Sequence, residues 1–252
     1  MYREWRSSLP GAVVWHRVTD GGEVVRVLPD GCLDLMWVAG DLLVAGPDTA
    51  AHVGSAPRGT SYLGLRFAPG TGPAVLGVPA CELRDRRIPL ADLWPAAQVR
   101  QALGRIARAA EPGALDPAGG LDPASGLDPA RALDSAAAAA LQEVARDRLR
   151  ATPWPDPAIV EIVSRLRAGA SVAGTADAVG AGRRRLHRRS LDAFGYGPKT
   201  LARILRMNRA IDLARAGTPF ATVAAATGYA DQAHLAREVK AMAGVTLTAL
   251  LG

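Results

Sequence analysis

Short apolar runs alternate with turn sequences over the first 70 residues. Runs rich in Val, Leu and Trp cover residues 13–18, 24–28, 33–38, 42–45 and 62–67, and turn residues such as Asp-Gly-Gly and Pro-Asp-Gly separate them. Short strands of this kind, at regular spacing, are typical of antiparallel sheets. The pattern predicts a small antiparallel β-barrel or sandwich, which the Pro-Gly-Thr-Gly sequence at 69–72 ends.

Helical patterns with an interruption follow this segment. Residues 73–95 carry scattered leucines, residues 96–110 predict a helix, and residues 135–150 form a second, Ala-rich helix. Between them, residues 113–131 repeat Leu-Asp-Pro three times. Because a proline every six residues prevents a long helix, we expect a linker or mobile loop there. Residues 153–157, rich in proline, end the second helix.

After residue 157 the apolar spacing is helical throughout. Ser171 is a suitable N-cap for a helix over 172–179, Gly180 is a suitable stop, and a further helix over 183–194 follows a tight turn. The same order returns, with a helix over 220–227, a stop at Gly228, and a helix that runs to Ala243. A helix, a tight Gly-containing turn and a second helix form a helix-turn-helix unit. The sequence predicts two of them.

A connecting helix over residues 198–216 joins the two units. It is 19 residues long, so it spans roughly 28 Å at about 1.5 Å per residue. Successive major grooves on one side of B-DNA are about 34 Å apart. A connector of this length would let two recognition helices reach neighbouring grooves.

Positive charge belongs to the second half of the chain. The whole chain has a net charge of +6, while residues 153–252 contain 14 Lys and Arg against 7 Asp and Glu, and residues 1–152 contain 16 against 17. A basic domain favours an anionic partner. Five arginines and a histidine occupy the seven positions 183–189.

Helical spacing orders these cations. Leu186, Ser190 and Phe194 share one side of the helix, whereas Arg184, His187 and Arg188 form a row on another side that could read base edges. The flanking cations suit phosphates and are Arg183, Arg185 and Arg189. A merely solvated face is the alternative. In the second unit the equivalent surface holds small or polar residues, Gln232, Ala233, Ala236 and Arg237, for which contact with the DNA backbone is the alternative to base reading.

The C-terminal region resembles the AraC/XylS family of bacterial transcription regulators. The resemblance rests on residues 225–240, with Gly-Tyr-Ala-Asp-Gln-Ala-His-Leu-Ala-Arg-Glu-Val-Lys at their end, and on Phe-Gly-Tyr-Gly-Pro-Lys at 194–199. It implies DNA contacts at Arg184, His187, Arg188, Ala233 and Arg237. The sequence departs from the family where Ser190 replaces an aromatic residue and where residues 247–250 replace the usual ending.

The N-terminal half is similar to sensor regions of some AraC-type regulators. The similarity rests on Leu-Pro-Asp-Gly-Cys-Leu-Asp-Leu at 28–35 and on segments at 67–79 and 88–93. It implies a ligand-responsive β-domain. Candidate ligand contacts are Trp15, Trp37, Asp30 and Asp34, with core packing of the tryptophans and capping of a hairpin by the aspartates as the alternatives.

Enzyme and metal chemistry have no support in the sequence. Cys32 and Cys81 are the only cysteines, and their spacing to His16 and His52 fits no usual metal-ligand pattern. Two cysteines favour a reducing compartment. Cys32, in a turn, is a candidate reactive thiol. No catalytic motif is present, so we expect no catalytic residue, no cofactor and no bound metal.

These observations predict an α+β protein of two domains. A β-rich domain with flanking helices covers residues 1–110, a linker and connecting helix cover 111–152, and an all-α domain with two helix-turn-helix units covers 153–252. The expected function is sequence-specific DNA-binding transcription regulation under a small-molecule effector. A ligand-sequestering or thiol-reactive β-domain fused to a DNA-binding module is the alternative. The expected partner is double-stranded DNA, with RNA polymerase as a candidate. The chain is expected to be cytoplasmic, without membrane contact, and a monomer or homodimer.

Overall fold

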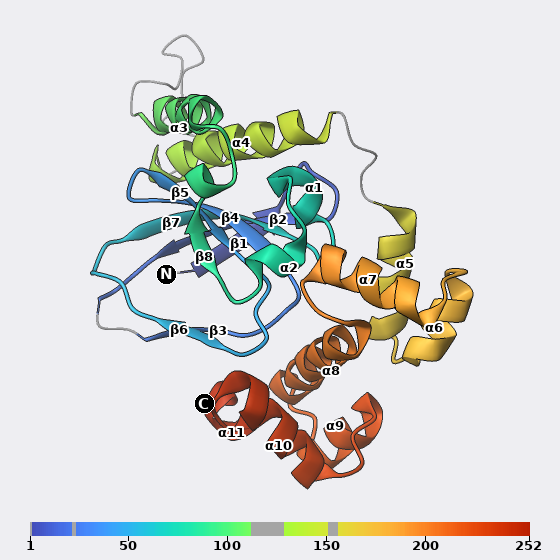
Figure 1. The fold of residues 1–252 in the computed structure, drawn as a ribbon. Helices are drawn as coiled ribbons and strands as arrows, with labels where there is room; N and C mark the ends of the chain where they lie inside the picture. Colours follow the sequence, from blue (N-terminus) through green and yellow to red (C-terminus); the bar gives the residue numbers. More distant parts are fainter. Residues whose placement is uncertain (1, 22–23, 112–128, 151–155) are drawn as a thin grey trace.

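A computed structural model describes residues 2–21, 24–111, 129–150 and 156–252 (Figure 1). Six strands form one antiparallel sheet in the order β1-β2-β7-β4-β5-β8, and β3 pairs with β6 in a separate ribbon. The strands are β1 (Tyr2–Arg6), β2 (Ala12–Val18), β3 (Val25–Val27), β4 (Leu33–Val38), β5 (Asp41–Ala45), β6 (His52–Gly54), β7 (Ser61–Phe67) and β8 (Arg87–Pro89).

The predicted fold class, a two-domain α+β protein, is confirmed, and one of the two predicted sheet forms is corrected. Within the described residues the sheet does not close into a barrel, because β1 pairs only with β2 and β8 pairs only with β5. The ribbon β3–β6 lies across from one face of the open sheet, as in a small sandwich (Figure 1).

The two faces of the sheet differ because side chains alternate along each strand. Leu35, Leu65 and Val14 stand opposite one another in the register of β4, β7 and β2, and all three are buried. Helices α3 (Ala96–Ala110) and α4 (Pro129–Leu149) cover this apolar face (Figure 1). The opposite face carries polar and charged side chains.

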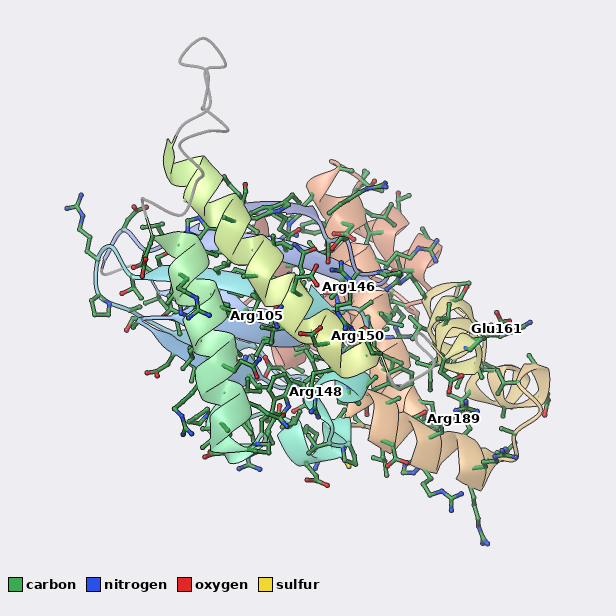
Figure 2. The ribbon with its side chains drawn as sticks, turned by 90° about the horizontal axis from the view of Figure 1, so that it is seen from above. Arg105, Arg146, Arg148, Arg150, Glu161 and Arg189 are labelled. Carbon is green, nitrogen blue, oxygen red and sulfur yellow. The ribbon has the colours of Figure 1, made fainter. Side chains whose placement is uncertain are left out.

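Contacts made by arginines hold α3 and α4 over the apolar face. Arg105 on α3 pairs with Asp147 on α4 at 2.6 Å, and the guanidinium of Arg148 lies 4.7 Å from the centre of the Trp94 ring. Figure 2 shows the arginines of α4 along this side of the molecule. Short helices complete the layer: α1 (Gly72–Leu76), α2 (Ala80–Leu83) and the 3-10 turn Leu90–Asp92.

The expected linker lies mostly outside the described residues. Of the predicted segment 113–131, residues 113–128 are not described, and the described part begins at Pro129 as the first turn of α4. The proline-rich break predicted at 153–157 lies outside them except for Asp156 and Pro157, which start the next helix. Side chains of α4 such as Leu141 and Ala145 are buried in the core of the sheet.

Seven helices form the described C-terminal part around a core of its own. They are α5 (Pro157–Arg167), α6 (Val172–Ala178), α7 (Arg183–Phe194), α8 (Pro198–Arg215), α9 (Phe220–Thr227), α10 (Gln232–Ala243) and α11 (Leu247–Leu251). Residues 247–250, where the sequence departs from the AraC pattern, still form a helical turn within α11. The Thr246 hydroxyl caps this turn by accepting a hydrogen bond from the Ala249 amide at 3.2 Å. None of the described helices is long and apolar enough to cross a membrane.

Candidate DNA interface and ligand pocket

The first helix-turn-helix unit consists of α6 and α7. The Ser171 hydroxyl caps α6 by accepting a hydrogen bond from the Gly174 amide at 3.0 Å. Gly180 then turns the chain in the left-handed region, with φ of +60°, which costs glycine least. Leu186, Ser190 and Phe194 are each fully buried, so the predicted core side of α7 does face the interior.

The opposite side of α7 presents the predicted row of cations. Arg184, His187 and Arg188 are exposed, as are Arg183 and Arg185. The His187 ring lies over the turn into α8, because a Cβ built on Gly197 would be 2.9 Å from its Nε2. The structure therefore brings five of the six predicted side chains together on one exposed surface.

Arg189 is placed differently from its neighbours. It is half-buried, and its Nη2 lies 2.5 Å from Oδ2 of Asp156, the residue that caps α5. In Figure 2 the Arg189 label lies between α7 and the preceding helices. Its charge is thus paired within the protein.

The second unit repeats this arrangement with α9 and α10. Gly228 makes the left-handed turn at φ of +75°, and the Asp231 carboxylate caps α10 by accepting a hydrogen bond from the His234 amide at 2.6 Å. Leu235 and Val239 face the core. The four predicted residues of this unit are all exposed: Gln232, Ala233, Ala236 and Arg237.

Helix α8 holds the second unit through a charge cluster. Arg203 and Arg206 both pair with Glu238 on α10, at 2.8 and 3.4 Å. The hydrogen bond from Arg203 keeps the pKa of Glu238 below its usual value, although partial burial opposes this effect. The guanidinium of Arg206 also lies 4.2 Å from the centre of the Tyr229 ring. These contacts fix the orientation of α10 relative to α8.

A cavity of about 290 Å³ lies between the polar face of the sheet and the ribbon β3–β6. Three of the four predicted ligand residues line it, namely Trp15, Asp30 and Asp34. Apolar side chains at the same cavity are Val25, Val27, Met36 and Leu43. Trp37 lies elsewhere: it follows Met36 on β4, so it points to the opposite face, where it packs against the core under α3 and α4.

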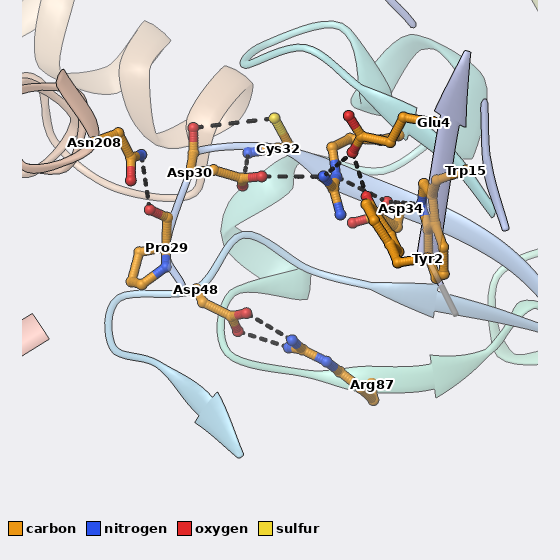
Figure 3. Close-up of polar contacts among 11 residues, drawn as sticks. Tyr2, Glu4, Trp15, Pro29, Asp30, Cys32, Asp34, Asp48, Arg87 and Asn208 are labelled. Atoms are coloured by element: carbon orange, nitrogen blue, oxygen red, sulfur yellow. Dashed lines mark hydrogen bonds and ion pairs between the residues drawn. The ribbon is translucent and has the colours of Figure 1, made fainter. Parts of the chain in front are cut away.

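A single guanidinium, that of Arg66, organises the polar end of this cavity. Figure 3 labels the acidic side chains around it, Glu4, Asp30 and Asp34. Arg66 lies 3.2 Å from Asp34, 3.7 Å from Asp30 and 3.1 Å from Glu4. The indole N–H of Trp15 donates to Asp34 at 2.6 Å.

Burial dominates the ionisation of Asp34. It raises the pKa of this carboxyl to about 6, because the lowering by Arg66 and by the hydrogen bonds is smaller. Burial alone would lower the pKa of Arg66. The carboxylates around it together outweigh this effect and raise the pKa above its usual value, so the guanidinium stays charged. The cluster has more acids than bases.

The environment of Cys32 disfavours a reactive thiol. Burial raises its pKa well above the usual value, and the charges of Asp30 and Asp34 raise it further. Because its pKa is raised, this thiol stays protonated at neutral pH. The nucleophilic form of cysteine is the thiolate. Among the described residues, no group of three His, Cys, Asp or Glu side chains is placed to hold a metal ion.

Several residues that line the cavity are not among those predicted from the sequence. Arg66 lies in a strand that was predicted as apolar. Arg87 and Tyr2 lie in strands that were not predicted. Arg87 forms a bidentate ion pair with Asp48, with both distances 2.6 Å (Figure 3). An arginine within the apolar sequence Leu-Gly-Leu-Arg-Phe of β7 is the signal that could have revealed Arg66.

The ribbon and the loops around the cavity also bind the C-terminal helices. Arg26 on β3 donates to the Ala243 carbonyl at the end of α10 at 2.8 Å, and the Ala51 amide donates to the Met242 carbonyl at 2.7 Å. Asn208 on α8 donates to the Pro29 carbonyl at 3.0 Å, next to the charge cluster (Figure 3).

The contact at α7 is close as well. Arg84 donates to the carbonyl of Gly195, which caps α7, at 3.3 Å. A Cβ on Gly195 would lie 2.7 Å from Pro47, and one on Gly70 would lie 2.3 Å from Ile159. Glycine is needed at both points because the two parts of the chain approach so closely.

Comparison with known proteins places this geometry in a family. The family described as a helix-turn-helix domain matches residues 175–252, which run from within α6 to the end of the chain. Over residues 175–252 the chain therefore belongs to this helix-turn-helix family. A domain of unknown function (DUF6597) matches residues 12–89, which hold β2 to β8 and most of the cavity.

Solved structures that are similar to this one cover nearly the whole chain. The apo form of a ToxT variant from Vibrio cholerae is 12% identical, covers 98% of each chain and has a TM-score of 0.50. Wild-type ToxT from Vibrio cholerae with a bound unsaturated fatty acid is also 12% identical, covers 98% of this chain and 97% of its own, and has a TM-score of 0.49. At this identity the first likeness establishes the fold. No curated protein sequence matches the chain.

Proposed function

We propose that this chain is an AraC-family regulator, that it binds DNA sequence-specifically and that a small molecule in the sheet cavity controls its DNA binding. The observation that carries the proposal is the ribbon β3–β6. Val25 and Val27 line the cavity, while Arg26 between them reaches the end of α10. One short strand therefore contacts both the ligand space and a recognition helix.

The exposed residues of the two units are proposed to make different kinds of contact with DNA. Arg184, His187 and Arg188 on α7 are proposed to read base edges, since an arginine can bind guanine through two hydrogen bonds. Arg183 and Arg185 suit phosphates. Arg189, which is paired with Asp156, supports the start of α5 and reaches DNA only if that pair opens.

On α10 the surface is less polar. Gln232 and Arg237 supply hydrogen-bond donors, and Ala233 and Ala236 are small enough to let the helix approach the groove closely. We therefore propose that α7 contributes most of the sequence specificity and that α10 contributes mostly affinity.

The coupling has a physical basis in the bond made by Arg26. A cation at the carbonyl end of a helix is favourable, because the last carbonyls carry partial negative charge. A hydrogen bond to a charged group contributes about 1.5 kcal/mol or more, which is about a tenfold change in an equilibrium constant. A ligand that moves β3 would strengthen or break this bond. The free energy that holds α10 in its position would then change by a measurable amount.

The experiment starts from compounds that raise the Tm of the full chain. Leu43→Trp fills the cavity, so a cavity ligand should stabilise the wild-type protein and not this variant. That ligand should change the affinity of the wild-type protein for a duplex selected from a random library. Arg26→Ala should still bind the ligand but should lose most of the change in DNA affinity.

Arg86→Ala is the matched control, because Arg86 donates to the Glu82 carbonyl within the N-terminal part. This variant should keep the full effect of the ligand. A cavity ligand that leaves the DNA affinity unchanged in the wild-type protein would contradict effector control. An equal effect in Arg26→Ala would contradict coupling through the ribbon.

The remaining expectations stand as proposals. We propose that the DNA-binding domain spans residues 153–252 and that the ligand domain extends beyond 110 to about residue 150, since α4 packs in its core. The family and fold are those of a transcription regulator, and we propose no enzymatic activity. Contact with RNA polymerase, action as a monomer or homodimer, and a cytoplasmic location are likewise proposed.

A further inference from the structure

A groove of about 620 Å³ runs along α8 between the two helix-turn-helix units. Residues 166–172, at the junction of α5 and α6, form one wall, and residues 225–228, at the end of α9, form the other. The floor is one side of α8. The groove shares no lining residue with the sheet cavity.

The groove is strongly cationic. Five of its lining residues are basic and none is acidic; the basic residues are Arg167, Lys199, Arg203, Arg206 and Arg209. Arg203 and Arg206 are paired with Glu238. In the described parts of the chain, the other three have no carboxylate partner and all three are exposed. These three charges are accessible to an anion from outside the protein.

The spacing of the cations suits a linear array of negative charges. Lys199, Arg203, Arg206 and Arg209 are separated by four, three and three residues, which places them in a row along one side of α8. From the first to the last the row covers about 15 Å at about 1.5 Å per residue. Phosphates of one DNA strand follow one another at about 3.4 Å of rise along the duplex axis, so the row is long enough to face more than one phosphate.

The groove lies between the first helices of the two helix-turn-helix units. Figure 1 shows α6 and α9 projecting from α8 on the side away from the sheet. The groove wall at Ser171 is the start of α6, and the wall at Gly228 leads directly into α10. When recognition helices occupy two successive major grooves, the minor groove between them, with its two backbones, faces the connecting surface.

The lining disfavours a protein partner. Protein interfaces depend on aromatic or large aliphatic anchors in well-packed pockets. The lining residues here include no aromatic side chain, and many are alanine or glycine, such as Ala202, Ala225 and Gly228. Small side chains leave room for a sugar–phosphate backbone to approach α8 closely.

We propose that this groove binds the DNA backbone beside the central minor groove and that Arg167, Lys199 and Arg209 each contact a phosphate. These residues position the duplex without reading its sequence. The inference rests on DNA binding by the two units, and it is independent of effector control.

The test replaces all three residues in the full chain, as Arg167→Gln, Lys199→Gln and Arg209→Gln. Binding is measured by fluorescence anisotropy on a duplex selected with the wild-type protein and on a scrambled duplex, over a range of KCl concentrations. Three lost phosphate contacts should reduce the slope of log Kd against log salt concentration by about 2.7. Affinity should fall by the same factor on both duplexes, by at least roughly tenfold at low salt.

A charge-matched control carries Arg100→Gln, Arg108→Gln and Arg215→Gln. These arginines are exposed and lie outside the groove, and Arg215 is on the same helix. The control should keep the wild-type slope, and circular dichroism should show that both variants are folded. An unchanged slope in the groove variant would overturn the proposal. So would a loss of polymerase recruitment with intact DNA affinity, because that result would assign the groove to an acidic protein segment.

Discussion

Asp34 gives the most direct test of the polar end of the cavity. Its side chain is 14% exposed, accepts the Trp15 indole hydrogen bond at 2.6 Å and lies 3.2 Å from Arg66. Burial nevertheless raises its pKa from 3.8 to about 6. Asp34→Asn keeps the shape and one hydrogen-bond acceptor but cannot ionise.

The sign of the effect follows from proton binding. Between pH 3.8 and about 6 the folded protein holds a proton at Asp34 that the unfolded chain has lost. The contribution of Asp34 to the free energy of unfolding is therefore full below pH 3.8 and falls as the pH rises to about 6. A difference of about 2 in pKa, at 1.36 kcal/mol for each pH unit, corresponds to about 3 kcal/mol.

The assay compares chemical unfolding of the wild-type protein and Asp34→Asn from pH 3.5 to 7.5. The wild-type protein should lose up to about 3 kcal/mol relative to the variant over this range. Carboxyl ¹³C NMR should show one titration near pH 6 that the variant lacks. Asp147→Asn is a control of opposite sign, since its hydrogen bond with Arg105 lowers the pKa of Asp147. A constant difference between wild type and Asp34→Asn would refute the reasoning, because it would mean that Arg66 keeps Asp34 ionised at low pH.

Three further predictions concern packing and specificity. Ser190→Ala should raise the free energy of unfolding by about 1 kcal/mol in thermal or urea unfolding, because the buried Ser190 hydroxyl has no hydrogen-bond partner among the described residues; a destabilised variant would show that this hydroxyl is bonded. Gly64→Ala should cost about 1–3 kcal/mol and change the tryptophan fluorescence, since its Cβ would lie 2.1 Å from the Trp15 indole; an unchanged spectrum would mean that the indole does not rest on Gly64. Arg184→Ala or Arg188→Ala should cost about 1–3 kcal/mol at one base position in binding to a panel of mutated sites, and an equal loss on every site would assign the residue to a phosphate.

The helical half of the fold could be predicted in detail from the sequence. Helical periodicity is a local property, so Leu186, Ser190 and Phe194 could be assigned to the core side of α7 from their spacing alone. The stop signals at Gly180 and Gly228 are local as well, because each residue adopts the left-handed conformation that ends a helix. The exposed rows on α7 and α10 follow from the same periodicity.

The ligand half could be predicted only in outline. Strands β6 and β8 are three residues long, and their place depends on partners far away in the chain, which no local pattern reveals. The cavity depends on register: Arg66 stands opposite Asp34 only because β7 pairs with β4 in one alignment. Trp37 and Met36 are adjacent in sequence but lie on opposite faces of the sheet, because side chains alternate along a strand.

The contact between the two halves could not be predicted either. The bond from Arg26 to Ala243 joins residues that are 217 positions apart. The fit of Gly70 against Ile159 likewise appears only in the folded chain. The proposed control of DNA binding therefore rests on structural observations that the sequence does not contain.

Hydroxyl-radical footprinting of the full chain on a selected duplex tests most directly whether one molecule reads two neighbouring turns of DNA. We predict two protected segments on the same face of the duplex, with centres about 10 base pairs apart. Arg184→Ala should relax sequence selectivity in one segment and leave the other intact. A single protected segment, or two segments on opposite faces of the duplex, would contradict the account.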